Sequence, residues 1–151
     1  MKFRFATLAV AAVVSASAAL MGCSAPGGGS TDDSGGGEGE PIKIGAIFSL
    51  SGPAAAFGIP EQNAAEVAVQ YVNDNGGIDG RMLELVVVDD KTDPTEAARA
   101  AQKLISSDGV IAIVGASTGS GTLAMAPVAA QNGVPVIAPN GTIGVTDPEE
   151  S

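Results

Sequence analysis

The sequence predicts an α/β fold built on a doubly wound parallel sheet. Four short apolar runs, at residues 42–48, 82–88, 110–114 and 134–138, have the composition of strands. Each interval between them contains a run with helical periodicity, so the order is β-α-β-α-β-α-β. Right-handed crossovers then place helices on both faces of the sheet. In the strand order 2-1-3-4, a crevice opens at the carboxyl ends of the first and third strands.

The first strand is expected at residues 42–48, where an alternating pattern becomes continuously apolar. A loop containing glycine and proline follows at residues 49–58. The next helix is predicted over residues 60–73, because Pro60 suits a first helical position. Its apolar face comprises Ala64, Ala65, Ala68, Val69 and Val72, and Asn75-Gly76-Gly77 ends it.

The second strand, at residues 82–88, is followed by a helix with a clear start signal. Asp93, Pro94 and Glu96 occupy the N-cap, N1 and N3 positions of a capping box. The helix is expected over residues 97–106 and ends at Asp108-Gly109. Its inward residues are predicted to be Ala98, Ala101, Leu104 and Ile105.

The third strand, at residues 110–114, leads into a loop of small and hydroxyl residues at 115–122. A helix is predicted over residues 123–131, with Pro127 kinking it or lying near its first turns. Pro135 suits the start of the fourth strand, and residues 139–142 form a further polar loop. A strand, a Gly/Ser/Thr loop and a helix N-terminus together favour an anion-binding cradle.

The three loops at 49–58, 115–122 and 139–142 are expected to share one mouth, and they contain no charged residue. Their hydroxyl and amide groups suit a small carboxylate, whereas none offers a general base or activated nucleophile. The chain has no histidine and a single cysteine, which argues against zinc sites and His- or Cys-based catalysis. Asp89, Asp90 and Asp93 resemble a cation site, but a turn and a helix cap account for them. We therefore expect no catalytic residue, cofactor or metal.

The N-terminal residues indicate export. Residues 1–22 have the basic start and short apolar core of a signal peptide, and they end before Cys23. Leu20-Met21-Gly22-Cys23 is similar to the lipobox of bacterial lipoproteins, which predicts a lipid on Cys23 that anchors the protein to the outer face of the membrane. Residues 23–40 read as a disordered Gly/Ser/Asp/Glu linker, and residues 41–151 as the folded part. Without residues 1–22, five cationic residues face 17 acidic ones, a net charge of −12 that argues against nucleic acid.

A competing motif lies in the third loop. Residues 115–121 fit Gly-x-x-x-Gly-x-Gly, which resembles the cofactor loop of short-chain dehydrogenases. In that family the loop follows the first strand, and a Tyr-x-x-x-Lys motif is required. Here the only tyrosine, Tyr71, is followed four residues later by Asn75. A nicotinamide-dependent enzyme is therefore the weaker hypothesis.

The order and spacing of many short motifs resemble the branched-chain amino-acid (leucine/isoleucine/valine) binding proteins of bacterial ABC importers. The resemblance implies the first lobe of a type I periplasmic binding protein, incomplete because that family is about twice this length or more. A sensory ligand-binding domain on the same fold is the alternative. The matching motifs are Ile42-Lys43-Ile44-Gly45, Leu50-Ser51-Gly52-Pro53, Phe57-Gly58, Val72-Asn73, Gly76-Gly77-Ile78, Gly80, Asp89-Asp90, Asp93-Pro94, Ala97-Ala98, Val114-Gly115, Ala126-Pro127-Val128-Ala129 and Gly133-Val134-Pro135-Val136-Ile137.

The resemblance also implies how a ligand is held, by lobe closure and without chemistry. Groups after the third and fourth strands grip the α-carboxylate and part of the ammonium, and Phe57 shields the ligand. Gly119 departs from the family, which usually has serine there. The implied ligand is a branched-chain amino acid or a related small carboxylate or amide, and the implied partners are an ABC permease and its ATPase. An isolated first lobe should fold weakly and bind no ligand tightly. The implied ligand-binding residues are Ser51, Phe57, Thr118, Gly119, Ser120, Asn140 and Thr142.

Overall fold

The computed structural model describes residues 39–142 of the 151-residue chain. The predicted signal peptide, Cys23 and nearly all of the predicted linker lie outside the described residues, as do residues 143–151. No helix within residues 39–142 is both long enough and apolar enough to cross a membrane.

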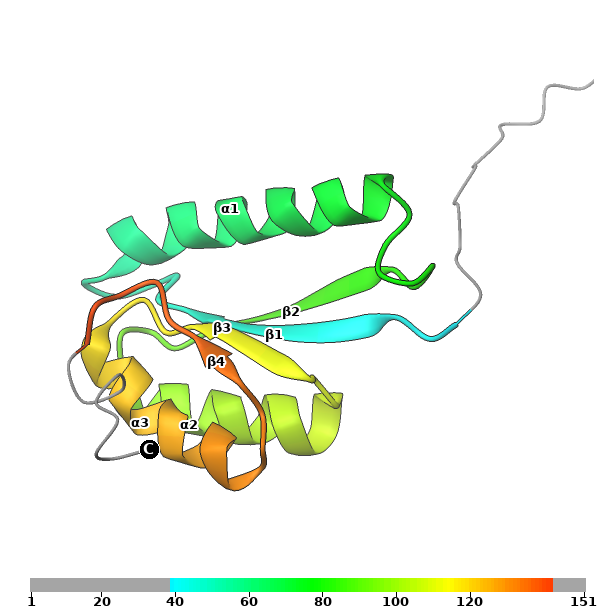
Figure 1. Ribbon diagram of the computed structural model, residues 1–151. Coiled ribbons are helices and arrows are strands. Elements are labelled where there is room, and N and C mark those ends of the chain that lie inside the picture. The colour runs from blue at the N-terminus through cyan, green and yellow to red at the C-terminus, as the bar shows by residue number, and fades with distance from the viewer. Residues whose placement is uncertain (1–38, 143–151) are drawn as a thin grey trace, which may run out of the picture. The chain divides into compact units, whose positions relative to one another are not determined.

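Four parallel strands form one sheet in the order β2-β1-β3-β4, as predicted (Figure 1). They are β1 (Ile42–Phe48), β2 (Leu83–Asp89), β3 (Ala112–Gly115) and β4 (Val136–Ile137). Phe48 pairs with Asp89, and Ile47 pairs with Gly115, so β1, β2 and β3 end at the same edge. The loops that follow them therefore start side by side.

Helices cover both faces, which confirms the doubly wound arrangement (Figure 1). Helix α1 (Ala55–Asp74) lies on one face, and α2 (Pro94–Lys103) and α3 (Gly119–Gln131) lie together on the other. The main apolar core fills the space between α2, α3 and the sheet, where its removal from water stabilises the fold. It contains Ile47, Ala97, Ala100, Ala101, Leu104, Val110, Ile113, Ala116 and Met125.

The predicted start of α1 is wrong by five residues. The helix begins at Ala55, so Pro60 lies inside it and deprives it of one backbone hydrogen bond. Gly58, the one buried residue of α1, lies in this added first part of the helix, where its bare backbone packs against Ser49. Two of the predicted inward residues, Ala64 and Ala68, are exposed.

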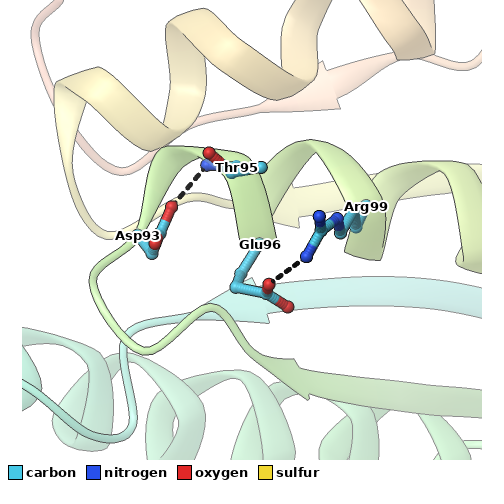
Figure 2. Close-up of polar contacts among 4 residues, drawn as sticks. All are labelled: Asp93, Thr95, Glu96 and Arg99. Carbon is cyan, nitrogen blue, oxygen red and sulfur yellow. Dashed lines mark hydrogen bonds and ion pairs between the residues drawn. The ribbon is translucent and has the colours of Figure 1, made fainter.

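The predicted capping box of α2 is half right (Figure 2). The Asp93 side chain accepts a hydrogen bond from the Thr95 amide at 2.7 Å, as an N-cap should. Glu96 does not complete the box, because the Asp93 amide already donates to the Asp90 carbonyl at 2.8 Å. Instead Glu96 pairs with Arg99, Oε1 to Nη1, at 2.6 Å.

The remaining boundaries differ from the predictions by a few residues. Helix α2 passes into a π-helical segment, η1 (Leu104–Asp108), which ends at Gly109 in the left-handed conformation. Strand β4 has only two residues, and Pro135 lies just before it, where its carbonyl accepts from the Ile113 amide at 2.9 Å. The proline therefore sits at the strand's start, as predicted.

Candidate functional site

Three loops meet at the carboxyl edge of the sheet. We call them the β1 loop (residues 49–54), the β3 loop (116–118) and the β4 loop (138–142). The Ser49 amide of the β1 loop donates to Ser117 Oγ of the β3 loop at 3.0 Å. Asn140 Nδ2 of the β4 loop donates to the Ala116 carbonyl at 2.8 Å. The predicted convergence of these loops on one mouth is confirmed.

Helix α3 points its N-terminus into this mouth. It begins at Gly119 rather than at the predicted 123, because Thr118 is its N-cap and Thr118 Oγ1 accepts from the Gly121 amide at 3.2 Å. Gly119 and Ser120 therefore form the first turn. Among residues 39–142 no oxygen accepts a hydrogen bond from either of their amides. Two donors at the positive end of a helix are thus available to an anion.

Thr142 occupies the space that a side chain at position 119 would fill. A Cβ built on Gly119 would lie 2.5 Å from Thr142 Oγ1. The Thr142 hydroxyl in turn donates to Asn140 Oδ1. Gly119 stands where the family usually has serine, and the Thr142 hydroxyl of the β4 loop lies where the serine side chain would be.

Ser51 and Phe57 are not tied to these groups by any hydrogen bond in the described residues. The Ser51 hydroxyl donates to Asp89 Oδ2 at 2.6 Å. Phe57 is the third residue of α1, and 66% of its surface is exposed. A direct ligand contact by either residue remains a prediction.

Two carboxylates at the end of β2, Asp89 and Asp90, support the β1 loop, a role that the sequence did not predict. Asp89 Oδ1 accepts from the amides of Leu50 and Ser51, at 2.9 and 3.2 Å. Asp90 is 1% exposed, and its Oδ1 accepts from the Ser49 hydroxyl at 2.7 Å. This contact could have been predicted from the parallel pairing of β1 and β2, because that pairing places Asp89 and Asp90 beside residues 49–51.

The hydrogen bonds to Asp89 predict an acid-sensitive contribution to stability. Partial burial raises the pKa of Asp89, but the Ser51 hydroxyl and the amides of Lys91, Leu50 and Ser51 together hold it below its ordinary value of 3.8. A carboxylate whose pKa is lowered by folding stabilises the folded state at pH values above its unfolded pKa. This stabilisation is lost as the pH falls through the folded-state pKa. We expect the urea concentration at the unfolding midpoint to decrease when the pH is lowered below about 4. The decrease should be smaller in Asp89→Asn. Equal acid sensitivity in the two proteins would contradict the assignment.

Within residues 39–142 the three loops thus offer amide and hydroxyl groups, and the nearby Asp89 and Asp90 carboxylates accept hydrogen bonds from the β1 loop. Among residues 39–142, no three His, Cys, Asp or Glu side chains lie together as a metal site. The loop of the competing dehydrogenase motif follows β3, not the first strand. Hydrogen-bond donors of this kind suit a small anion.

A parallel α/β lobe whose loops meet at the strand ends is the architecture of a solute-binding class of protein, and the family comparison agrees. Residues 41–151 match the model of the periplasmic binding protein family, and the chain belongs to that family. Its similarity within the family is to the branched-chain amino-acid binding proteins, which confirms the resemblance stated above.

Individual relatives support this placement. The chain is 38% identical over 101 residues to the Leu/Ile/Val-binding protein BraC3 of Rhizobium johnstonii, covering 67% of this chain and 27% of that protein. It is 35% identical over 103 residues to the Leu/Ile/Val-binding protein of Escherichia coli K12, covering 68% and 28%. The crystal structure of LivJ from Streptococcus pneumoniae in complex with isoleucine is 42% identical, with a TM-score of 0.65, over 66% of this chain and 29% of that one. The chain thus spans less than a third of the length of these relatives.

Proposed function

We propose that this chain forms the carboxylate-binding lobe of an extracytoplasmic solute-binding lipoprotein, anchored through Cys23, that serves an ABC importer. The ligand is a branched-chain amino acid, held by closure of a second lobe and passed to a permease driven by its ATPase. The names of the relatives support the ligand class and the transport role. The exported, lipid-modified N-terminus is supported by the sequence of residues 1–23.

The observation that carries this proposal is the pair of amides at the N-terminus of α3 that donate to no oxygen within residues 39–142. The Gly119 and Ser120 amides face a mouth bordered by the Thr142 and Ser117 hydroxyls, and no carboxylate lies among the β3 and β4 loops. Charge-assisted hydrogen bonds from amides to a carboxylate are stronger than neutral ones. A ligand carboxylate would therefore satisfy both amides and interact with the helix dipole.

The test is calorimetric titration of the complete gene product with leucine, isoleucine and valine, using leucinamide as the matched control. Leucinamide keeps the side chain and the amine but lacks the carboxylate. Leucinamide loses the charge and one of the two acceptor oxygens, so one hydrogen bond is lost and the other is weakened, which predicts that it binds about 100-fold more weakly than leucine. Equal binding of leucine and leucinamide, or no binding of any of the three amino acids, would refute the proposal.

A further inference from the structure

The β4 loop contains a side chain whose hydrogen bonds leave it a single orientation. Asn140 Nδ2 carries two hydrogens and donates to the Ala116 carbonyl at 2.8 Å and to Thr122 Oγ1 at 2.9 Å. A carbonyl oxygen can only accept. If the Asn140 amide were flipped, its oxygen would face the Ala116 oxygen, which excludes that orientation.

This orientation decides the direction of the next hydrogen bond. Asn140 Oδ1 must lie toward Thr142, and an amide oxygen cannot donate. The single hydroxyl hydrogen of Thr142 is therefore the one shared between the two groups, and Thr142 is the donor. Toward the mouth, Thr142 Oγ1 can therefore only accept a hydrogen bond.

The rest of the network is consistent with these directions. The Thr122 hydroxyl is buried and directs its own hydrogen to the Thr118 carbonyl at 3.1 Å, so it accepts from Asn140. Thr142 Oγ1 lies directly over Gly119, next to the amides at the start of α3. A ligand at this point meets donors on α3 and an acceptor on the β4 loop, within one small region.

We propose that Asn140 is a positioning residue that fixes the Thr142 hydroxyl as an acceptor, so the site requires a hydrogen-bond donor on the ligand atom next to its carboxylate. Asn140 acts here through Thr142 rather than by touching the ligand. The expected effect on ligand preference rests on the proposed function. The orientation of the Thr142 hydroxyl can be tested without any ligand.

The binding test compares leucine with 4-methyl-2-oxopentanoate, which has an acceptor oxygen in place of the ammonium group. In Thr142→Val, leucine should bind about tenfold more weakly, the size of one hydrogen bond, while the oxo acid is unaffected. In Asn140→Ala the freed hydroxyl can turn and donate to the oxo acid, so the preference for leucine should fall about tenfold. Asn63→Ala is the control, because Asn63 is an asparagine exposed on α1, and this variant should keep the wild-type preference.

The ligand-free readout is the exchange rate of the Thr142 hydroxyl hydrogen, measured by NMR. It should be slow in the wild-type protein and at least about tenfold faster in Asn140→Ala, because a hydrogen-bonded hydroxyl is protected. Equal exchange rates, or equal losses of leucine and oxo acid affinity in Asn140→Ala, would overturn the inference. Failure of the wild-type protein to bind leucine would refute the proposed function alone, since the exchange rates would still decide the role of Asn140.

Discussion

Replacing Gly119 by alanine is expected to weaken leucine binding by at least about tenfold, with little change in the stability of the fold. The added Cβ would lie 2.5 Å from Thr142 Oγ1, and 3.5 Å from Thr142 Cβ. The Thr142 side chain can rotate away at low cost, so the fold survives. Rotation, however, breaks the bond to Asn140 and removes the acceptor from the mouth.

The matched control for this variant is Gly141→Ala in the β4 loop. A Cβ on Gly141 meets no heavy atom within 4 Å, so both binding and melting temperature should stay at the wild-type level. Calorimetric titration with leucine and a thermal melt of each variant separate the two effects. If Gly119→Ala binds leucine as tightly as Gly141→Ala does, Thr142 is not a ligand contact.

The sheet was predictable because its residues report burial directly. Parallel strands covered on both faces are largely apolar, and the stretches 44–48 and 85–88, which follow Lys43 and Glu84, meet this condition. Three right-handed crossovers then leave few possible strand orders. The mouth followed from this order, because loops after neighbouring parallel strands lie together.

The helix ends and the supporting contacts were less predictable because their causes are distant in the sequence. Thr142 lies 23 residues from Gly119, and the Ser51–Asp89 hydrogen bond joins residues 38 apart. Glu96 has the right spacing for a capping box, but the Asp93 amide already donates to the Asp90 carbonyl and is not free to donate to the Glu96 side chain. Local patterns predict what a residue prefers, whereas these contacts depend on which groups tertiary packing leaves free.

Helix α1 illustrates the same limit in its packing. Its predicted apolar face was assigned by periodicity, yet Ala64 and Ala68 of that face are exposed, and Gly58 is the one residue of the helix that is buried. Periodicity ranks side chains by hydrophobicity. Hydrophobic periodicity therefore cannot identify Gly58, which is buried because it has no side chain.

Replacing Gly58 by alanine is therefore expected to destabilise the fold, although alanine is the better helix former by up to about 1 kcal/mol. An added Cβ would collide with the carbonyl oxygen, carbonyl carbon and nitrogen of Ser49, all of which are backbone atoms. Backbone cannot rotate away as a side chain does, so α1 must move off the end of β1. Overpacking of this kind costs about 2 kcal/mol in the free energy of unfolding, or roughly 8–16 °C in melting temperature for a domain of about 100 residues.

Urea unfolding followed by circular dichroism measures this loss, with Asn63→Ala as the control within the same helix. Asn63 is exposed on α1, so its replacement should change the free energy of unfolding by less than about 0.5 kcal/mol. The Ser49 amide also donates to Ser117 and its hydroxyl to Asp90, so a displaced Ser49 would loosen the β1 loop from the β3 loop. Gly58→Ala should thus weaken leucine binding as well as stability, and a variant as stable as Asn63→Ala would show that α1 does not depend on this contact.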